Sequence, residues 1–131
     1  MAVPMTAAAD ARFDGADLIV DGLLGYSAKG APRGEMESLI RDADRSRVPI
    51  LAVDLPSGLD PDSGVPLGIA IRAACTVTLA VPKTGLLVTA ARNLVGELLL
   101  ADIGIPPAAY ERFGVDARAL FTEGDMVRVL T

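Results

Sequence analysis

The sequence predicts a mainly parallel α/β domain, and three observations support that fold class. Short apolar runs rich in Leu, Ile, Val and Ala recur along the chain, which is typical of strands buried on both faces. A helical pattern separates the first two runs, so that strand, helix and strand form a βαβ unit. The chain has 131 residues, which is enough for one domain and too few for two.

The predicted βαβ unit comes first in the chain. Residues 17–21 form an apolar run between two glycines, which predicts a buried strand. Residues 35–47 predict a helix, because Met36, Leu39, Ile40 and Ala43 recur at helical spacing and acidic residues occupy the first turn. Residues 50–53 predict a second strand, which a right-handed crossover makes parallel to the first.

The rest of the chain predicts a continuation of the same sheet. We expect a short helix over 68–74, a third strand over 75–80 and a fourth strand over 97–103, with the apolar tract 85–106 read as core strand plus loop. A short helix is expected over 106–112. The tail is expected to pack on the sheet edge through Leu120, Phe121, Val127, Val129 and Leu130.

Composition and charge exclude several classes of protein. The net charge is −5 without a basic run, so no nucleic-acid footprint is visible, and the single Cys75 allows no intrachain disulfide. The start of the chain lacks the basic and apolar regions of a signal peptide. The apolar tract is interrupted by Arg92, Glu97 and Asp102, which argues against a membrane span. A soluble cytoplasmic protein without nucleic-acid or membrane partners is expected.

Three polar residues follow the predicted strands. Asp21 ends the first strand, Asp54 follows the second and Lys83 follows the third. Parallel sheets bind ligands at the carboxyl ends of their strands, so these side chains are expected to converge. Because the chain has no histidine, acid/base chemistry would have to use groups such as these.

Two segments beside these residues suggest ligand binding. The glycine-rich loop of residues 22–30 could surround an anion with backbone amides, although ordinary connections also need glycine. In Asp54-Leu-Pro-Ser-Gly-Leu-Asp60, Pro56 restricts the backbone and holds the carboxylate and the Ser57 hydroxyl in a defined relation. Asp21 and Ser57 could therefore supply oxygen ligands to a hard cation.

Each candidate also has a purely structural interpretation. Either aspartate could cap a turn, and Ser57 could be a turn residue. Lys83 could be a simple strand-end cation, and Tyr26 could serve only in packing. Lys29 is expected to be a solvated loop charge rather than a ligand.

Four ordered blocks within residues 17–106 resemble the NAD(P)H-hydrate epimerase family, whose domain is the YjeF N-terminal domain. The blocks are Asp17-Leu-Ile-Val-Asp-Gly-Leu-Leu-Gly25, Val53-Asp-Leu-Pro-Ser-Gly-Leu-Asp60, Val81-Pro-Lys-Thr-Gly-Leu86 and Ala101-Asp-Ile-Gly-Ile-Pro106. The resemblance implies a Rossmann-like three-layer αβα fold and an isomerase that interconverts the R and S epimers of hydrated NADH or NADPH. It further implies a potassium ion held by Asp21 and Ser57, catalytic roles for Asp54 and Lys83, and substrate contacts from Asp54, Gly25, Tyr26, Ser27, Ala28, Lys29, Gly30 and Ala31.

The chain departs from this family at its start. The family carries further α/β units and a glycine-rich loop upstream of the matched blocks, so the N-terminal half of the domain is expected to be missing. Residues 1–16 are interpreted as a linker or remnant, and residues 17–131 as the C-terminal part. The resemblance also implies a homodimer for the intact protein and a functional link to a hydrate dehydratase. We expect the chain alone to be marginally stable, oligomeric or aggregation-prone, with little or no activity. The alternative is a non-catalytic nucleotide-binding or scaffold module of the same fold.

Overall fold

Five strands form one sheet in the computed structural model, which describes residues 3–122 and 124–129. The strands lie in the order in which they occur in the chain, and the first four are parallel. The last strand pairs antiparallel with its neighbour. The prediction of a mainly parallel α/β domain is therefore confirmed. The strands are β1 (Ile19–Asp21), β2 (Ile50–Val53), β3 (Cys75–Leu79), β4 (Glu97–Ala101) and β5 (Met126–Arg128).

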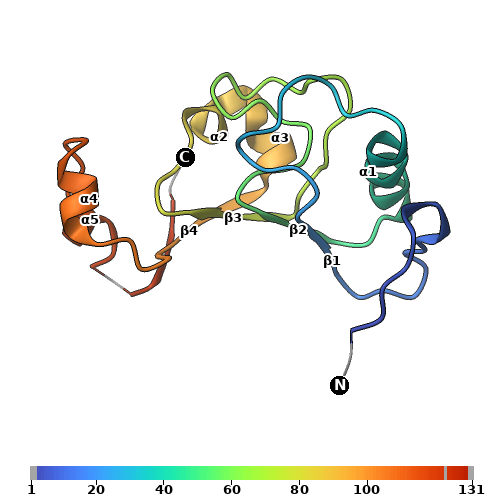
Figure 1. The fold of residues 1–131 in the computed structure, drawn as a ribbon, viewed down its shortest axis with the longest axis horizontal. Helices are drawn as coiled ribbons and strands as arrows, with labels where there is room; N and C mark the ends of the chain where they lie inside the picture. The colour runs from blue at the N-terminus through green and yellow to red at the C-terminus, as the bar shows by residue number, and fades with distance from the viewer. Residues whose placement is uncertain (1–2, 123, 130–131) are drawn as a thin grey trace.

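The helices that connect the parallel strands all lie on one face of the sheet (Figure 1). α1 (Glu35–Ser46) joins β1 to β2 and ends at Arg47, whose φ of 60° is left-handed. Three short helices join β3 to β4, and two more follow β4 at the far end of the sheet. The helices between β3 and β4 are α2 (Thr84–Leu87), η2 (Thr89–Ala91) and α3 (Arg92–Val95). The helices after β4 are α4 (Pro107–Glu111) and α5 (Ala117–Leu120).

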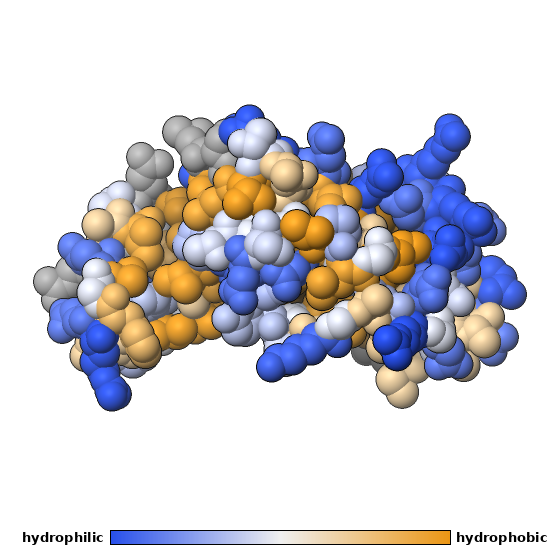
Figure 2. Space-filling model, turned by 90° about the horizontal axis from the view of Figure 1, so that it is seen from above, coloured by the Kyte–Doolittle hydropathy of each residue, from blue (hydrophilic) through white to orange (hydrophobic). Residues whose placement is uncertain are grey.

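Two clusters of buried apolar side chains fill the space between these helices and the sheet. The first joins α1 to β2, and the second joins α2 and α3 to β4 and to the segment after β2. Figure 2 views this covered side, where hydrophobic residues gather near the centre and charged residues toward the end that carries α1. The first cluster comprises Ile40, Ala43, Ile50, Ala52, Ile71 and Ala73, and the second Leu55, Leu59, Leu86, Ala91, Val95 and Leu98.

Burial alternates along the central strands, because only one face is covered. In β3, Thr76 and Thr78 are fully buried, whereas Cys75, Val77 and Leu79 are half-buried. The buried Thr76 hydroxyl donates a hydrogen bond to the Val95 carbonyl at 2.7 Å, which satisfies a polar group inside the core. Within the described residues, the second helical layer of a three-layer fold is not present.

The prediction of a short helix over 68–74 is wrong, because no helix lies there. The segment leads down into β3 (Figure 1), and three of its amides donate to distant carbonyls. The Ile71 amide donates to Ser57 at 2.9 Å, the Ala73 amide to Leu94 at 2.9 Å and the Ala74 amide to Ile50 at 2.8 Å. Tertiary hydrogen bonds thus outweigh the local helical tendency.

The apolar tract 85–106 contains helices that the sequence did not predict. α2 and α3 have four residues each, and the extended Val88 follows α2, so no helical period is long enough to recognise. The fourth strand ends at Ala101 rather than at residue 103. Directly after it, the Asp102 carboxylate accepts a hydrogen bond from the Gly104 amide and turns the chain.

The two ends of the chain pack against opposite parts of the sheet. Near the start, η1 (Ala8–Asp10) lies beside α1, and Phe13 packs against the first cluster. The tail forms β5 at the sheet edge, where Val127 pairs with Leu100, and buries part of Val129 against the second cluster, which confirms the predicted edge packing for these two residues. Residues 1–2 and Leu130 lie outside the described residues. No helix in the described part of the chain is long and apolar enough to cross a membrane.

Candidate functional site

The two aspartates lie at the same end of neighbouring parallel strands, as predicted. Asp21 is the last residue of β1 and pairs in register with Ala52 of β2. Asp54 follows the last residue of β2. Both carboxylates therefore stand at the carboxyl rim of the sheet, where α/β proteins bind ligands.

Asp21 and Ser57 form the first of two polar clusters on this rim. Both side chains are buried. The Ser57 hydroxyl donates to Oδ1 of Asp21 at 2.6 Å, and the Ser57 amide donates to Oδ2 at 2.8 Å. In turn, the Ser57 hydroxyl oxygen accepts the amide of Leu24 at 2.9 Å. These bonds tie the segment after β2 to the loop after β1.

The buried Asp21 carboxylate is stabilised by hydrogen bonds rather than by an opposite charge. No ion pair among the described residues involves Asp21. A carboxylate and a hydroxyl together offer the oxygen ligands that hard cations prefer, so the donor set fits such an ion. Within the described part of the chain, no group of three acidic or cysteine side chains is placed to hold a metal.

Asp54 and Lys83 form the second cluster. The Lys83 ammonium group donates to Oδ1 of Asp54, to the Leu79 carbonyl at 3.1 Å and to the Thr78 hydroxyl at 3.3 Å. Both partners of the ion pair are mostly enclosed, with 19% of the Asp54 side chain and 13% of the Lys83 side chain exposed. A pair this enclosed is better protected from solvent screening than a surface pair.

The backbone at Asp54 directs its carboxylate toward Lys83. Its φ is 73°, a left-handed conformation that aspartate tolerates better than most residues. The Asp54 amide donates to the Val77 carbonyl at 2.8 Å, and Oδ1 accepts the Leu79 amide at 3.3 Å. The carboxylate is therefore anchored to the end of β3, where the chain turns toward Lys83.

A cavity of about 610 Å³ opens onto the Asp54–Lys83 pair. Its polar wall contains both members of the pair and the exposed Asp62. Its apolar wall brings together Tyr26 from the loop after β1 and Ile103 from the segment after β4. The remaining lining residues are Leu79, Ala80, Val81, Pro82 and Thr84.

Of the loop residues Gly25 to Ala31, Tyr26 alone lines this cavity. It is 57% exposed, so its ring is available at the cavity mouth rather than packed in the core. The other six residues of the loop lie mostly at the surface, where the Ala28 amide donates to the Gly25 carbonyl in a turn. The structure thus gathers Asp54, Lys83 and Tyr26, and holds Asp21 with Ser57 in a separate cluster.

Sequence reasoning missed the residues that support Lys83. The Thr78 hydroxyl and the Leu79 carbonyl both face the ammonium group. The loop between β2 and β3 also contributes, because its Pro61 carbonyl accepts the amide of Gly85 in α2 at 2.7 Å. A Cβ at Gly85 would lie 2.6 Å from the Asp60 carbonyl oxygen, so only glycine fits this contact. The glycine in the Pro-Lys-Thr-Gly segment was the one sequence signal for this packing.

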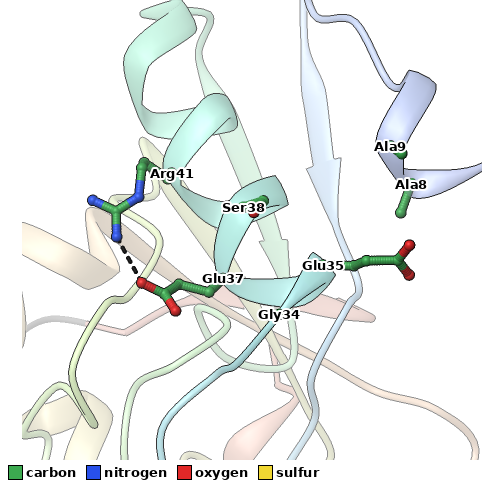
Figure 3. Close-up of a pocket in the computed structure, with 7 residues that line it drawn as sticks. All are labelled: Ala8, Ala9, Gly34, Glu35, Glu37, Ser38 and Arg41. Carbon is green, nitrogen blue, oxygen red and sulfur yellow. Dashed lines mark hydrogen bonds and ion pairs between the residues drawn. The ribbon is translucent and has the colours of Figure 1, made fainter.

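A second cavity, of about 550 Å³, lies between η1 and the start of α1 (Figure 3). Glu35 points toward the segment that carries Ala8 and Ala9, while Glu37 forms an ion pair with Arg41 at 2.6 Å. These charged groups are exposed, and none of them converges with the strand-end residues. This cavity offers only the surface groups of a helix start.

Among the residues that the structure describes, three titratable groups have a shifted pKa. Hydrogen bonds from the Ser63 hydroxyl and amide lower the pKa of Asp60, which stabilises the turn between β2 and β3. Burial raises the pKa of Tyr110, and Asp102 raises it further. Burial also raises the pKa of the Cys75 thiol, so the thiol is predominantly protonated at neutral pH.

Comparison with known proteins identifies the family. The model of the family described as YjeF-related protein N-terminus matches residues 2–85. The chain belongs to this family. Its matched segment includes β1, β2, β3 and every residue of the two polar clusters.

Similar proteins carry related names. The chain is 47% identical to an NAD(P)H-hydrate epimerase of Dehalogenimonas lykanthroporepellens over 87% of this chain and 45% of that protein. It is 43% identical to an NAD(P)H-hydrate epimerase of Pirellula staleyi over 82% of this chain and 48% of that protein. A bifunctional NAD(P)H-hydrate repair enzyme of Pyrobaculum aerophilum is 42% identical over 88% of this chain and 25% of that protein.

The fold also has a counterpart among solved structures. The crystal structure of yeast ynu0 superposes with a TM-score of 0.69 and 24% identity, and covers 86% of this chain and 46% of that chain. The mainly parallel fold of the family is thus confirmed. The chain spans about half the length or less of the curated relatives that it matches.

Proposed function

We propose that this chain contributes the catalytic rim of an NAD(P)H-hydrate epimerase, an isomerase that interconverts the R and S epimers of hydrated NADH or NADPH. Two relatives at 47% and 43% identity bear this name. The observation that carries the proposal is the enclosed Asp54–Lys83 pair, which opens onto a cavity of about 610 Å³ at the carboxyl rim. Enclosed polar groups that converge on such a cavity are typical of active sites.

The reaction needs one group that can both accept and return a proton. Epimerisation requires either opening and closing of the hydrated ring or loss and return of water. In the first route, Asp54 takes the hydroxyl proton as the carbon–nitrogen bond breaks, and a proton returns to the ring nitrogen. In the second route, the protonated carboxyl gives its proton to the leaving hydroxyl and recovers it from the returning water. Lys83 orients the carboxylate in both routes.

We propose that the remaining candidates assist binding. Tyr26 would pack against the planar part of the substrate, and the backbone amides of residues 25–31 would approach its phosphates. Asp21 and Ser57 would hold a potassium ion, supported by their oxygen donor set and the lack of a paired cation in the described residues. Bound there, potassium would supply positive charge that fixes the loop after β1.

The wider context is also proposed. Three bacterial and archaeal relatives are named bifunctional NAD(P)H-hydrate repair enzymes, which supports a functional link to a hydrate dehydratase that consumes the S epimer. The intact protein is proposed to be a cytoplasmic homodimer that acts on NADH hydrate or NADPH hydrate.

The test follows the ratio of R to S hydrate after one epimer has been removed. Purified chain is measured alone and together with the part of the Dehalogenimonas relative that it does not match, with potassium and with sodium. Restoration of the R/S ratio should require Asp54, so Asp54→Asn should reduce the rate by about 100-fold or more, as expected for loss of a general acid/base.

A matched variant controls for charge at the cavity mouth. Asp62 lines the same cavity but is exposed and makes no side-chain contact with Lys83. Asp62→Asn should therefore retain the rate to within a few-fold. Equal rates for Asp54→Asn and the unaltered chain would end the catalytic assignment, and binding of hydrate without epimerisation would favour the non-catalytic module.

A further inference from the structure

The ammonium group of Lys83 uses all of its hydrogens within the protein. A lysine ammonium group has three N–H donors and no acceptor. Here it donates to three oxygens, which are Oδ1 of Asp54, Oγ1 of Thr78 at 3.3 Å and the carbonyl oxygen of Leu79 at 3.1 Å. Lys83 therefore has no N–H left for a ligand in the adjoining cavity, and it influences the site through the groups that it holds.

Thr78 lies beside Asp54, where β2 has just ended and β3 continues. Val53 pairs with Val77 in register, so the next residues along the two parallel chains are also neighbours. The Thr78 side chain is fully buried, and a buried polar group needs a hydrogen-bond partner. Because an ammonium group can only donate, the Thr78 hydroxyl oxygen is the acceptor. It offers the ammonium group a neutral partner that leaves the charge of Asp54 uncompensated by any other acid.

The chain after β3 folds back so that Lys83 reaches Thr78, five residues earlier. Ala80 has a left-handed φ of 66°, and the Val81 amide donates to the Leu79 carbonyl at 2.8 Å. The same carbonyl also accepts the ammonium group. Two of the three acceptors thus belong to β3, so the ammonium group is fixed to the sheet as well as to the carboxylate.

The two oxygens of the Asp54 carboxylate are in different surroundings. Oδ1 accepts the Lys83 ammonium group, and it accepts the Leu79 amide at 3.3 Å. Among the residues that the structure describes, no hydrogen bond or ion pair reaches Oδ2. Because the Asp54 side chain lines the cavity, its unbonded oxygen is the one that is available to exchange a proton with a ligand there.

We propose that Thr78 is a positioning residue of the site. Its buried hydroxyl fixes the Lys83 ammonium group, which holds Oδ1 of Asp54 and leaves Oδ2 as the oxygen that exchanges the proton. The inference rests on the proposed epimerase function for this chemical step. The placement of the ammonium group does not depend on the reaction and can be measured without substrate.

The test compares two buried threonines of β3 in the full chain. Thr78→Val removes the hydroxyl that faces Lys83 and keeps a side chain of similar shape. Thr76→Val is the matched control, because Thr76 is equally buried on the same strand but its hydroxyl donates to the Val95 carbonyl. Thr78→Ser is the conservative variant, since it retains the hydroxyl.

Competitive acetylation with a trace of acetic anhydride measures how firmly the ammonium group is held. The chain has only two lysines, so the exposed Lys29 is an internal reference in the same sample. In the unaltered chain Lys83 should react at least about tenfold more slowly than Lys29, because its nitrogen must first leave three acceptors. Thr78→Val should raise the relative rate of Lys83 by about threefold or more, whereas Thr76→Val and Thr78→Ser should not.

Epimerisation is the second readout, in the assay already described for Asp54→Asn. Thr78→Val should lower kcat by about tenfold, as expected for the loss of a hydrogen bond to a charged group, and should leave KM within about twofold. The KM is spared because Thr78 is not among the residues that line the cavity. Thr76→Val and Thr78→Ser should retain kcat.

Acetylation of Lys83 as fast as that of Lys29 in the unaltered chain would overturn the proposal. Equal effects of Thr78→Val and Thr76→Val on either measurement would also overturn it, as would a loss in Thr78→Ser as large as that in Thr78→Val. A chain that binds hydrate without epimerising it would contradict the proposed function and the proton exchange at Oδ2. The acetylation rates would still decide whether Thr78 holds Lys83.

Discussion

At the scale of single residues, the rim is organised by two carboxylates in different surroundings. Asp21 is buried and receives hydrogen bonds from Ser57, whereas Asp54 is partly open to a cavity and pairs with Lys83. The first arrangement holds two chain segments together and leaves oxygen lone pairs for a cation. The second keeps a charged group next to space that a ligand can enter. The first environment suits a structural role for Asp21, and the second supports the chemical role that we propose for Asp54.

Ser57→Ala tests the structural cluster. The change removes the buried hydrogen bond to Asp21 and leaves the part-buried amide of Leu24 without its acceptor. An unsatisfied buried group costs about 1–3 kcal/mol, so the free energy of unfolding should fall by about that amount in urea titrations. Ser27→Ala on the exposed loop should change it by less than about 0.5 kcal/mol. Equal effects of the two substitutions would contradict the assigned role.

Much of the site could be predicted from residue positions. A polar residue at the end of an apolar strand lies at the carboxyl rim, which is why Asp21, Asp54 and Lys83 were found from the sequence. Their division into two clusters could not be predicted, because it depends on the left-handed φ of Asp54 and on the turn that brings Lys83 back over β3. Neither feature has a local sequence pattern.

At the scale of elements, the loop between β2 and β3 acts as a support for the start of α2. The Gly85 amide binds the Pro61 carbonyl, and the Gly64 amide binds the Asp60 carbonyl at 2.9 Å. Hydrogen bonds to the Asp60 carboxylate fix the intervening turn. Since Lys83 immediately precedes α2, this support sets the position of its ammonium group relative to Asp54.

Gly85→Ala tests this support. The new methyl group would lie 2.6–2.7 Å from three backbone atoms of the loop, so the loop or the helix must move. Overpacking of this kind costs about 1–3 kcal/mol, which chemical denaturation would detect. Gly25→Ala is the control, because nothing lies within 4 Å of a Cβ there. A Gly85→Ala chain as stable as the control would show that the contact is not rigid.

Element prediction succeeded where a pattern was long and failed where it was short. α1 has twelve residues and was predicted to within one residue, since three turns display a clear apolar face. The four-residue helices α2 and α3 display no complete period and were missed. Residues 68–74 were predicted to be helical, yet their amides bond to Ser57, Leu94 and Ile50 across the fold. Only tertiary structure could reveal those partners.

At the scale of the whole molecule, order should decrease from the centre of the sheet toward its edges. β3 is paired in parallel on both sides, while β1 has three residues and one neighbour. We expect the slowest amide hydrogen exchange in Cys75–Leu79 and the fastest among the parallel strands in Ile19–Asp21. Mass spectrometry of exchanged peptides would measure this gradient. Equal protection of β1 and β3 would mean that the edge is already covered.

The sequence predicted a mainly parallel sheet because buried parallel strands read as continuous apolar runs. It did not predict on which face each connection lies, since that follows from strand order rather than from composition. The same apolar runs would suit a sheet covered on one face or on both. Coordinates were needed to separate the buried set from the half-exposed set of side chains.

Strand order in this sheet also bears on how the chain folds. Among the described strands, each of β1 to β4 pairs with the strand that follows it in sequence, so none of these pairings waits for a distant segment to arrive. Loop closure between successive strands therefore costs comparatively little entropy, and topologies of this kind fold faster than those with remote pairings. During synthesis, each new strand can add to the growing edge as it emerges from the ribosome.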